Sequence, residues 1–143
     1  MNKTLTNRII FLLSISGLLV SLYLLKTYTS QSAIACFSGE GCDIVRKSTY
    51  AYPLGIPMPA IGIFGFGITA MLSFLITLKH KFHAQFVRVL LLISFLGFSF
   101  VVYLTSLEIW VIKAFCSWCL TAAGLQLLIF SLSIYLFLNE SRN

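Results

Sequence analysis

Residues 89–107 read VLLLISFLGFSFVVYLTSL, nineteen consecutive positions that carry no charged side chain. About 20 apolar residues in a helix cross the hydrocarbon core of a membrane, which is roughly 30 Å thick. Three other stretches lack Asp, Glu, Lys and Arg, namely Ile9–Leu25, Ser48–Leu78 and Ala114–Asn139. Charged residues make up 10% of the 143-residue chain, against about 25% in soluble domains, and the mean hydropathy is +0.96. We therefore predict an all-α integral membrane protein and exclude a soluble enzyme and a disordered tail.

The fold that follows is a bundle of four transmembrane helices, which form a single membrane domain over residues 1–143. Pro53, Pro57 and Pro59 break any helix before the second span, so we place the spans at about 9–28, 60–78, 89–107 and 115–138. Each span must be helical, because an unpaired backbone group in hydrocarbon costs several kcal/mol. A long loop, Lys26–Met58, is expected between the first two spans, and a short turn, Glu108–Lys113, between the last two.

The basic residues predict how these spans are oriented. Four spans put the N-terminus, the 79–88 connector and the C-terminus on one side, which carries six basic residues, Lys3, Arg8, Lys79, Lys81, Arg88 and Arg142. The other side carries four, Lys26, Arg46, Lys47 and Lys113. Cytoplasmic segments are enriched in Lys and Arg, so we expect cytoplasmic termini and an extracytoplasmic long loop. Since the basic residues flank apolar spans, the net charge of +6 indicates headgroup anchoring, by Arg46 and Lys47 among others, and no nucleic-acid partner.

The four cysteines fall in two pairs on the predicted outer side. Cys36 and Cys42 lie in the long loop, and Cys116 and Cys119 form a C-x-x-C motif where the fourth span begins. The unpaired N–H groups and the dipole at a helix N-terminus stabilise a thiolate, and cysteines in such pairs exchange disulfides readily. By itself, however, C-x-x-C is typical of both metal sites and redox sites.

Three interpretations of these cysteines remain open. A four-thiolate metal site is disfavoured in an oxidising compartment, so we expect no metal. Two disulfides that staple the outer loop would suit a four-span structural protein without catalysis, although a Cys116–Cys119 bridge closes a ring of little entropic value. A dithiol relay needs an electron acceptor. Because no haem, flavin or nicotinamide motif occurs, and His80 and His83 lie in the opposite connector, the acceptor would be a lipid-soluble quinone.

One combination of motifs carries a family resemblance. The run Cys42–Ala51, CDIVRKSTYA, is followed by Gly55-Ile56-Pro57, a glycine-rich span and the late C-x-x-C. In this order they resemble the vitamin K epoxide reductase family over nearly the whole chain. The likeness is to the bacterial type of homologue, here without a fused thioredoxin domain. Ala123 stands where the animal enzymes have a Tyr, so vitamin K epoxide is not the expected substrate.

The resemblance implies a quinone-dependent thiol-disulfide oxidoreductase of the bacterial inner membrane. Such an enzyme reoxidises a thioredoxin-like partner of the DsbA type and passes two electrons to a membrane quinone, of the menaquinone or ubiquinone type, which drives disulfide formation. Carried over by position, Cys36 would be open to the partner and Cys42 would attack Cys116. Cys119 would then face the quinone.

Two further residues are candidate quinone contacts by resemblance. Ser48 matches a Ser or Thr of the family near the active centre, where a hydroxyl could bond a quinone oxygen or a thiolate. The alternative for Ser48 is a cap on a short loop helix. Tyr50 holds the place of a family aromatic residue over the pocket. Together with Cys119, these residues make up the expected quinone site.

Overall fold

The computed structural model describes residues 2–37, 39–78 and 81–142, and contains helices and no strand within these ranges. Four long helices run along the molecule: α1 (Lys3–Ser30), α3 (Met58–Leu78), α4 (His83–Leu107) and α5 (Ser117–Ser141). All four are long and apolar enough to cross a membrane. The prediction of an all-helical chain with four apolar helices is therefore confirmed. Lys79 and His80 of the predicted connector lie outside the described residues.

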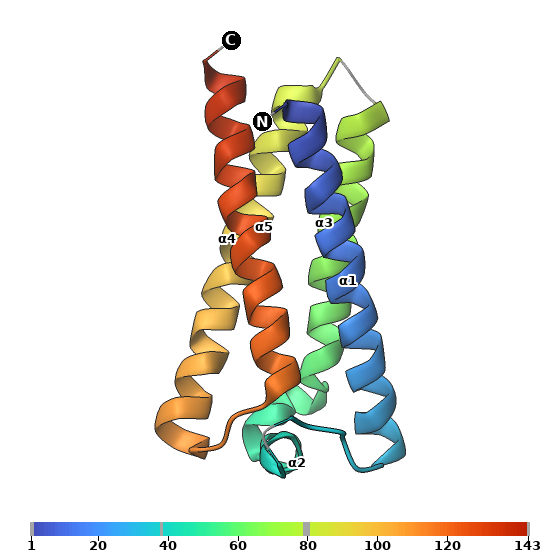
Figure 1. Ribbon diagram of the computed structural model, residues 1–143, viewed down its shortest axis with the longest axis vertical. Coiled ribbons are helices and arrows are strands. Elements are labelled where there is room, and N and C mark those ends of the chain that lie inside the picture. Colours follow the sequence, from blue (N-terminus) through green and yellow to red (C-terminus); the bar gives the residue numbers. More distant parts are fainter. Residues whose placement is uncertain (1, 38, 79–80, 143) are drawn as a thin grey trace.

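The helices form an up-and-down bundle with both chain ends at the same end of the molecule (Figure 1). Helix α1 packs against α3 and α5, while α4 packs against α5 and α3. Close approach depends on small residues, since a Cβ atom at Gly17 would collide with the ring of Phe66. Buried hydroxyls add hydrogen bonds between helices, as between Ser94 and Ser133 at 3.0 Å. Small residues and interhelical hydrogen bonds are the usual basis of helix association in lipid.

The second long helix begins earlier than the predicted span. We expected Pro59 to precede the helix, but α3 starts at Met58 and holds Pro59 in its first turn. Proline is tolerated there because the first N–H groups of a helix have no partner within it.

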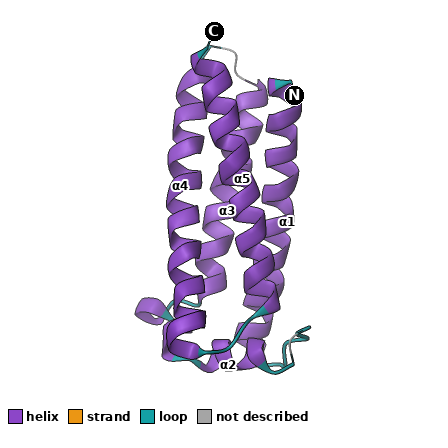
Figure 2. Cartoon of the chain, turned by 60° about the vertical axis from the view of Figure 1, so that its left-hand side comes forward, coloured by secondary structure: helices purple, strands orange, loops and turns teal. Residues whose placement is uncertain are grey.

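The long loop that we predicted between the first two spans is not confirmed. Residues 31–57 contain a short helix, α2 (Gly41–Lys47), and two 3-10 turns, η1 (Thr49–Ala51) and η2 (Pro53–Gly55). Figures 1 and 2 show α2 lying across the end of the bundle opposite the termini. The segment is thus a folded cap over that end.

The predicted turn at Glu108–Lys113 is also wrong. Residues Glu108–Ile112 form a π-helical turn, η3, which prolongs α4 by more than a turn before Lys113 ends it at a positive φ of 54°. Helical continuation turns the Glu108 side chain toward the bundle, where the residue is only 4% exposed. The structure therefore places a buried acid where the sequence suggested a solvated loop.

Candidate functional site

A disulfide links the first cysteine pair. Cys36 lies in the extended chain before α2, and Cys42 is the second residue of that helix. Their Cα atoms are 5.9 Å apart. Cys42 is buried, whereas Cys36 is partly exposed. The outer member of the pair is thus the more accessible to another protein.

The second pair stands at the start of α5 with both thiols free. Cys116 is the N-cap residue, and its Sγ accepts a hydrogen bond from the backbone N–H of Cys119 at 3.3 Å. A thiol hydrogen bond from Cys119 lowers the pKa of Cys116 below its ordinary value, against the opposing effect of burial. Cys116 is therefore the member of the pair that more readily becomes a thiolate, while Cys119 supplies a hydrogen-bond donor.

The two pairs meet at the same end of the bundle. Cys42 and Cys116 belong to one buried cluster, against which Cys36 and Cys119 pack. Cys36 Sγ lies 3.5 Å from the hydroxyl of Ser117. The indole N–H of Trp118 donates a hydrogen bond to the carbonyl of Ala35 at 2.7 Å. The cap is thus fastened to the first turn of α5, and the structure brings the four predicted catalytic cysteines together.

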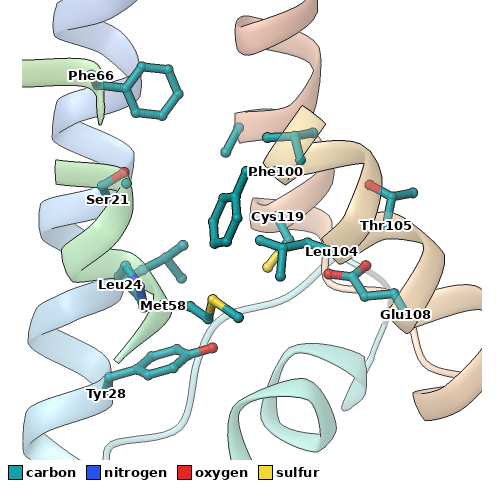
Figure 3. A pocket seen from close by; sticks show the side chains of 14 residues that line it. Ser21, Leu24, Tyr28, Met58, Phe66, Phe100, Leu104, Thr105, Glu108 and Cys119 are labelled. Carbon is teal, nitrogen blue, oxygen red and sulfur yellow. The ribbon is translucent and has the colours of Figure 1, made fainter. Parts of the chain in front are cut away.

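Beside Cys119, a cavity of about 100 Å³ lies between the four long helices (Figure 3). Its wall is mostly apolar and includes Leu24, Phe66 and Phe100. Two polar side chains point into it from opposite sides, Tyr28 on α1 and Glu108 at the end of α4. An apolar cleft with a few converging polar groups is the usual form of a small-molecule site.

A smaller recess of about 40 Å³ adjoins this cavity and brings the predicted quinone contacts together. Ser48, Tyr50 and Cys119 all line it, and so do Tyr28 and Glu108. Tyr50 is 48% exposed. Ser48 caps the C-terminus of α2, and its hydroxyl donates to the carbonyl of Val45 at 2.7 Å. Ser48 is therefore a helix cap, which was one of the two alternatives for it, and it also lines the recess.

Our sequence interpretation missed Glu108 and Tyr28. The carboxylate of Glu108 accepts a hydrogen bond from the backbone N–H of Cys116 at 3.5 Å, and Tyr28 is buried in the cluster that holds the cysteines. For Glu108 the signal was present in the sequence. It is an acid that directly follows an apolar span and precedes C-x-x-C by eight positions, so continuing the helix would have placed it beside the motif.

Arg46 does not anchor the protein at lipid headgroups as we expected. The residue is 8% exposed, and its guanidinium pairs with Asp43 at 3.0 Å. It also donates a hydrogen bond to the carbonyl of Thr27 in α1 at 3.4 Å. Arg46 thus ties α2 to the end of α1 within the protein.

The described part of the chain shows no group of three or more His, Cys, Asp or Glu side chains arranged to hold a metal ion. The features that distinguish the site are two adjacent cysteine pairs and an apolar cavity that reaches one of them.

In a comparison with protein-family models, residues 8–134 match the model described as the vitamin K epoxide reductase family. The matched region is most of the chain and includes the four cysteines, the cap and most of each long helix.

Proposed function

The chain belongs to the vitamin K epoxide reductase family, which makes it a membrane thiol oxidoreductase, and from that premise we propose that it oxidises a thioredoxin-like partner and reduces a membrane quinone. The partner would be of the DsbA type, and the quinone a menaquinone or ubiquinone. The net result is one disulfide made in the partner and two electrons delivered to the lipid phase, so that the protein drives disulfide formation.

In the first half of the cycle, a partner thiolate attacks Cys36 and breaks the Cys36–Cys42 disulfide. The second partner thiol then releases the partner in oxidised form. Cys42, now a thiolate, attacks Cys116 of a Cys116–Cys119 disulfide and frees Cys119. Cys36 then attacks Cys42, which restores the loop disulfide and leaves C-x-x-C reduced. Each step is thiolate attack on a disulfide, so thiolate fraction and access set the rate.

In the second half, the reduced C-x-x-C gives two electrons to the quinone and becomes a disulfide again. In this cycle, a loop disulfide beside a free C-x-x-C pair, the arrangement of the structure, is the form that would reduce the quinone. Cys119 is the donor in this proposal because it lines the cavity. Ser48 and Tyr50 are assigned to the quinone site because they line the adjoining recess.

One observation carries the proposal. Cys42 and Cys116 share a buried cluster, while Cys119 reaches the apolar cavity. In this proposal, an electron pair therefore passes from the cap to the cavity by disulfide exchange within one buried cluster. A quinone ring suits the cavity because it is flat and apolar apart from its carbonyl oxygens.

For the orientation, we propose that the cysteine end faces the extracytoplasmic side of a bacterial inner membrane and that both termini are cytoplasmic. The support is the Lys and Arg excess at the termini and the 79–88 connector. A DsbA-type partner outside the cytoplasm could then reach Cys36.

The test is quinol formation by purified protein with a reduced DsbA-type donor and a short-chain quinone. Cys119→Ser should abolish quinol formation and accumulate a Cys42–Cys116 disulfide, which forms when the Cys116 thiolate attacks Cys42 of the loop disulfide and releases Cys36. Cys36→Ser should block the partner reaction but leave some quinone reduction by a small dithiol. If both variants keep full activity, the cysteines are only structural staples and the relay is wrong.

A further inference from the structure

Glu108 occupies an unusual position for an acid. It lies at the junction of α4 and η3, 4% exposed, and lines both the apolar cavity and the recess beside it. Within the described residues it forms no salt bridge with a Lys, Arg or His side chain. Burying a carboxyl group without a basic partner is costly, so its presence calls for a role that an apolar residue could not fill.

The contacts of Glu108 are with the C-x-x-C motif. Its carboxylate accepts the backbone N–H of Cys116 at 3.5 Å, and Glu108 and Cys119 both line the cavity and the adjoining recess. Figure 3 shows the Glu108 carboxyl extending from α4 toward Cys119. The other titratable groups that face it are Cys116 on the α5 side, Tyr28 on α1 and, in the adjoining recess, Tyr50 of η1. The wall contributed by α3, with Met58, Pro59 and Phe66, holds no titratable group.

Quinone reduction in the second half of the cycle requires a proton to move from a thiol to the quinone. Cys119 lines the cavity as a free thiol. A thiol must lose its proton before its sulfur acts as a nucleophile. A quinone, in turn, must gain two protons as it takes two electrons.

We propose that Glu108 is the proton-transfer residue of this site, which takes the proton of the Cys119 thiol and delivers it to an oxygen of the quinone. The inference rests on the proposed function. The Cys119 sulfur adds to the quinone with its electron pair, and the Cys116 thiolate then attacks Cys119 to form the disulfide and release the reduced ring. Two electrons leave the thiols. One proton comes from Cys119 through Glu108 and the other from solvent, which gives disulfide and quinol.

The experiment separates the two halves of the cycle in single-turnover measurements. One follows oxidation of the reduced C-x-x-C by a short-chain quinone, and the other follows thiol exchange with a reduced DsbA-type donor. Glu108→Gln keeps an oxygen that can accept the Cys116 N–H but cannot take up a proton. Glu140→Gln is the matched control, because Glu140 bonds to Lys3 at the opposite end of the bundle.

We expect Glu108→Gln to slow quinone reduction at least a hundredfold, the ordinary contribution of a positioned acid or base, while thiol exchange stays within about twofold. The remaining rate should rise about tenfold per pH unit near neutrality, since only Cys119 that has lost its proton to solvent reacts. Glu108→Asp should restore part of the rate, and Glu140→Gln should match the wild type.

Four outcomes overturn the inference. A Glu108→Gln variant as fast as the wild type shows that no proton passes through this residue. Equal loss of both half-reactions shows a purely structural role. If Glu108→Gln does not fold, the rate of quinone reduction by the wild type is compared in H2O and D2O. Equal rates would contradict a proton transfer in this step. A wild type that reduces no quinone at all overturns the proposed function, and the inference with it.

Discussion

The indole N–H of Trp118 donates a hydrogen bond to the carbonyl oxygen of Ala35 across 2.7 Å. Trp118 lies inside the C-x-x-C motif, and Ala35 directly precedes Cys36. This one bond therefore joins the two cysteine pairs through the polypeptide that carries them. The proposed exchange between the pairs would require the cap to stay close to α5, and the bond holds it there.

Trp118→Phe should slow exchange between the two pairs by about fivefold. The substitution keeps an aromatic ring against Tyr23, whose ring centroid lies 5.0 Å from that of Trp118, but removes the donor. A single hydrogen bond contributes about 1 kcal/mol. The measurement is the rate at which the oxidised C-x-x-C accepts electrons from a reduced Cys36–Cys42 pair.

Quinone reduction by a C-x-x-C pair reduced in advance is the control for this variant, and it should be unchanged. If Trp118→Phe slowed both reactions equally, the indole would stabilise the start of α5 and not the position of the cap. The idea that it fastens the cap would then be wrong.

The reactivity of Cys116 should depend on its neighbour. The pKa of the Cys116 thiol is lowered chiefly by the hydrogen bond from Cys119, so Cys119→Ala should raise it toward the ordinary value. Because the thiolate is the form that is alkylated, the midpoint of Cys116 alkylation against pH should lie lower in the wild type than in Cys119→Ala. The extent of alkylation by a small neutral reagent, measured on the Cys116 peptide, reports this midpoint.

Cys119→Ser supplies the matched control for that titration. Its hydroxyl still donates a hydrogen bond to the Cys116 sulfur, so the midpoint should move less than in Cys119→Ala. Coincident midpoints in all three proteins would mean that the side chain at position 119 does not stabilise the Cys116 thiolate.

The sequence predicts well those parts of the fold that depend only on residues close together in the chain. A stretch such as 89–107 has to be a helix in lipid because no other structure satisfies its backbone. The start of α5 also follows locally, since the last uncharged stretch begins just before C-x-x-C. What each cysteine does in a reaction cycle, however, comes from resemblance and stays a prediction for this chain.

The parts that sequence missed depend on which way a side chain turns at the ends of the helices. Glu108 directly follows an apolar stretch. A charged residue at such a position is equally typical of a loop and of a helix that continues beyond the stretch. Only the continuation through Ile112 buries it. Arg46 lies in the seven-residue helix α2, whose inward face depends on where α1 ends. The cavity is beyond prediction for the same reason, because it depends on how four helices cross.

Arg46→Ala should loosen the cap. The change removes the ion pair with Asp43 and the hydrogen bond to the Thr27 carbonyl, and it leaves a partly buried carboxylate without its partner. Charged hydrogen bonds of this kind contribute about 2 kcal/mol. We expect residues 31–57 to become more sensitive to protease in detergent and the melting temperature to fall. Lys47→Ala, at the exposed neighbouring position, should change neither, and equal protease sensitivity in the two variants would contradict this role for Arg46.

Packing between α1 and α3 gives a prediction that is independent of the chemistry. Gly17→Ala places a Cβ atom on the ring of Phe66, whereas a Cβ at Gly65 in α3 meets no atom within 4 Å. Overpacking costs about 1–3 kcal/mol, while Gly to Ala within an unobstructed helix is favourable by about 0.5–1 kcal/mol. Thermal unfolding in one detergent should therefore give a lower melting temperature for Gly17→Ala and an equal or higher one for Gly65→Ala. Equal melting temperatures for the two variants would mean that α1 and α3 do not pack at Gly17 as described.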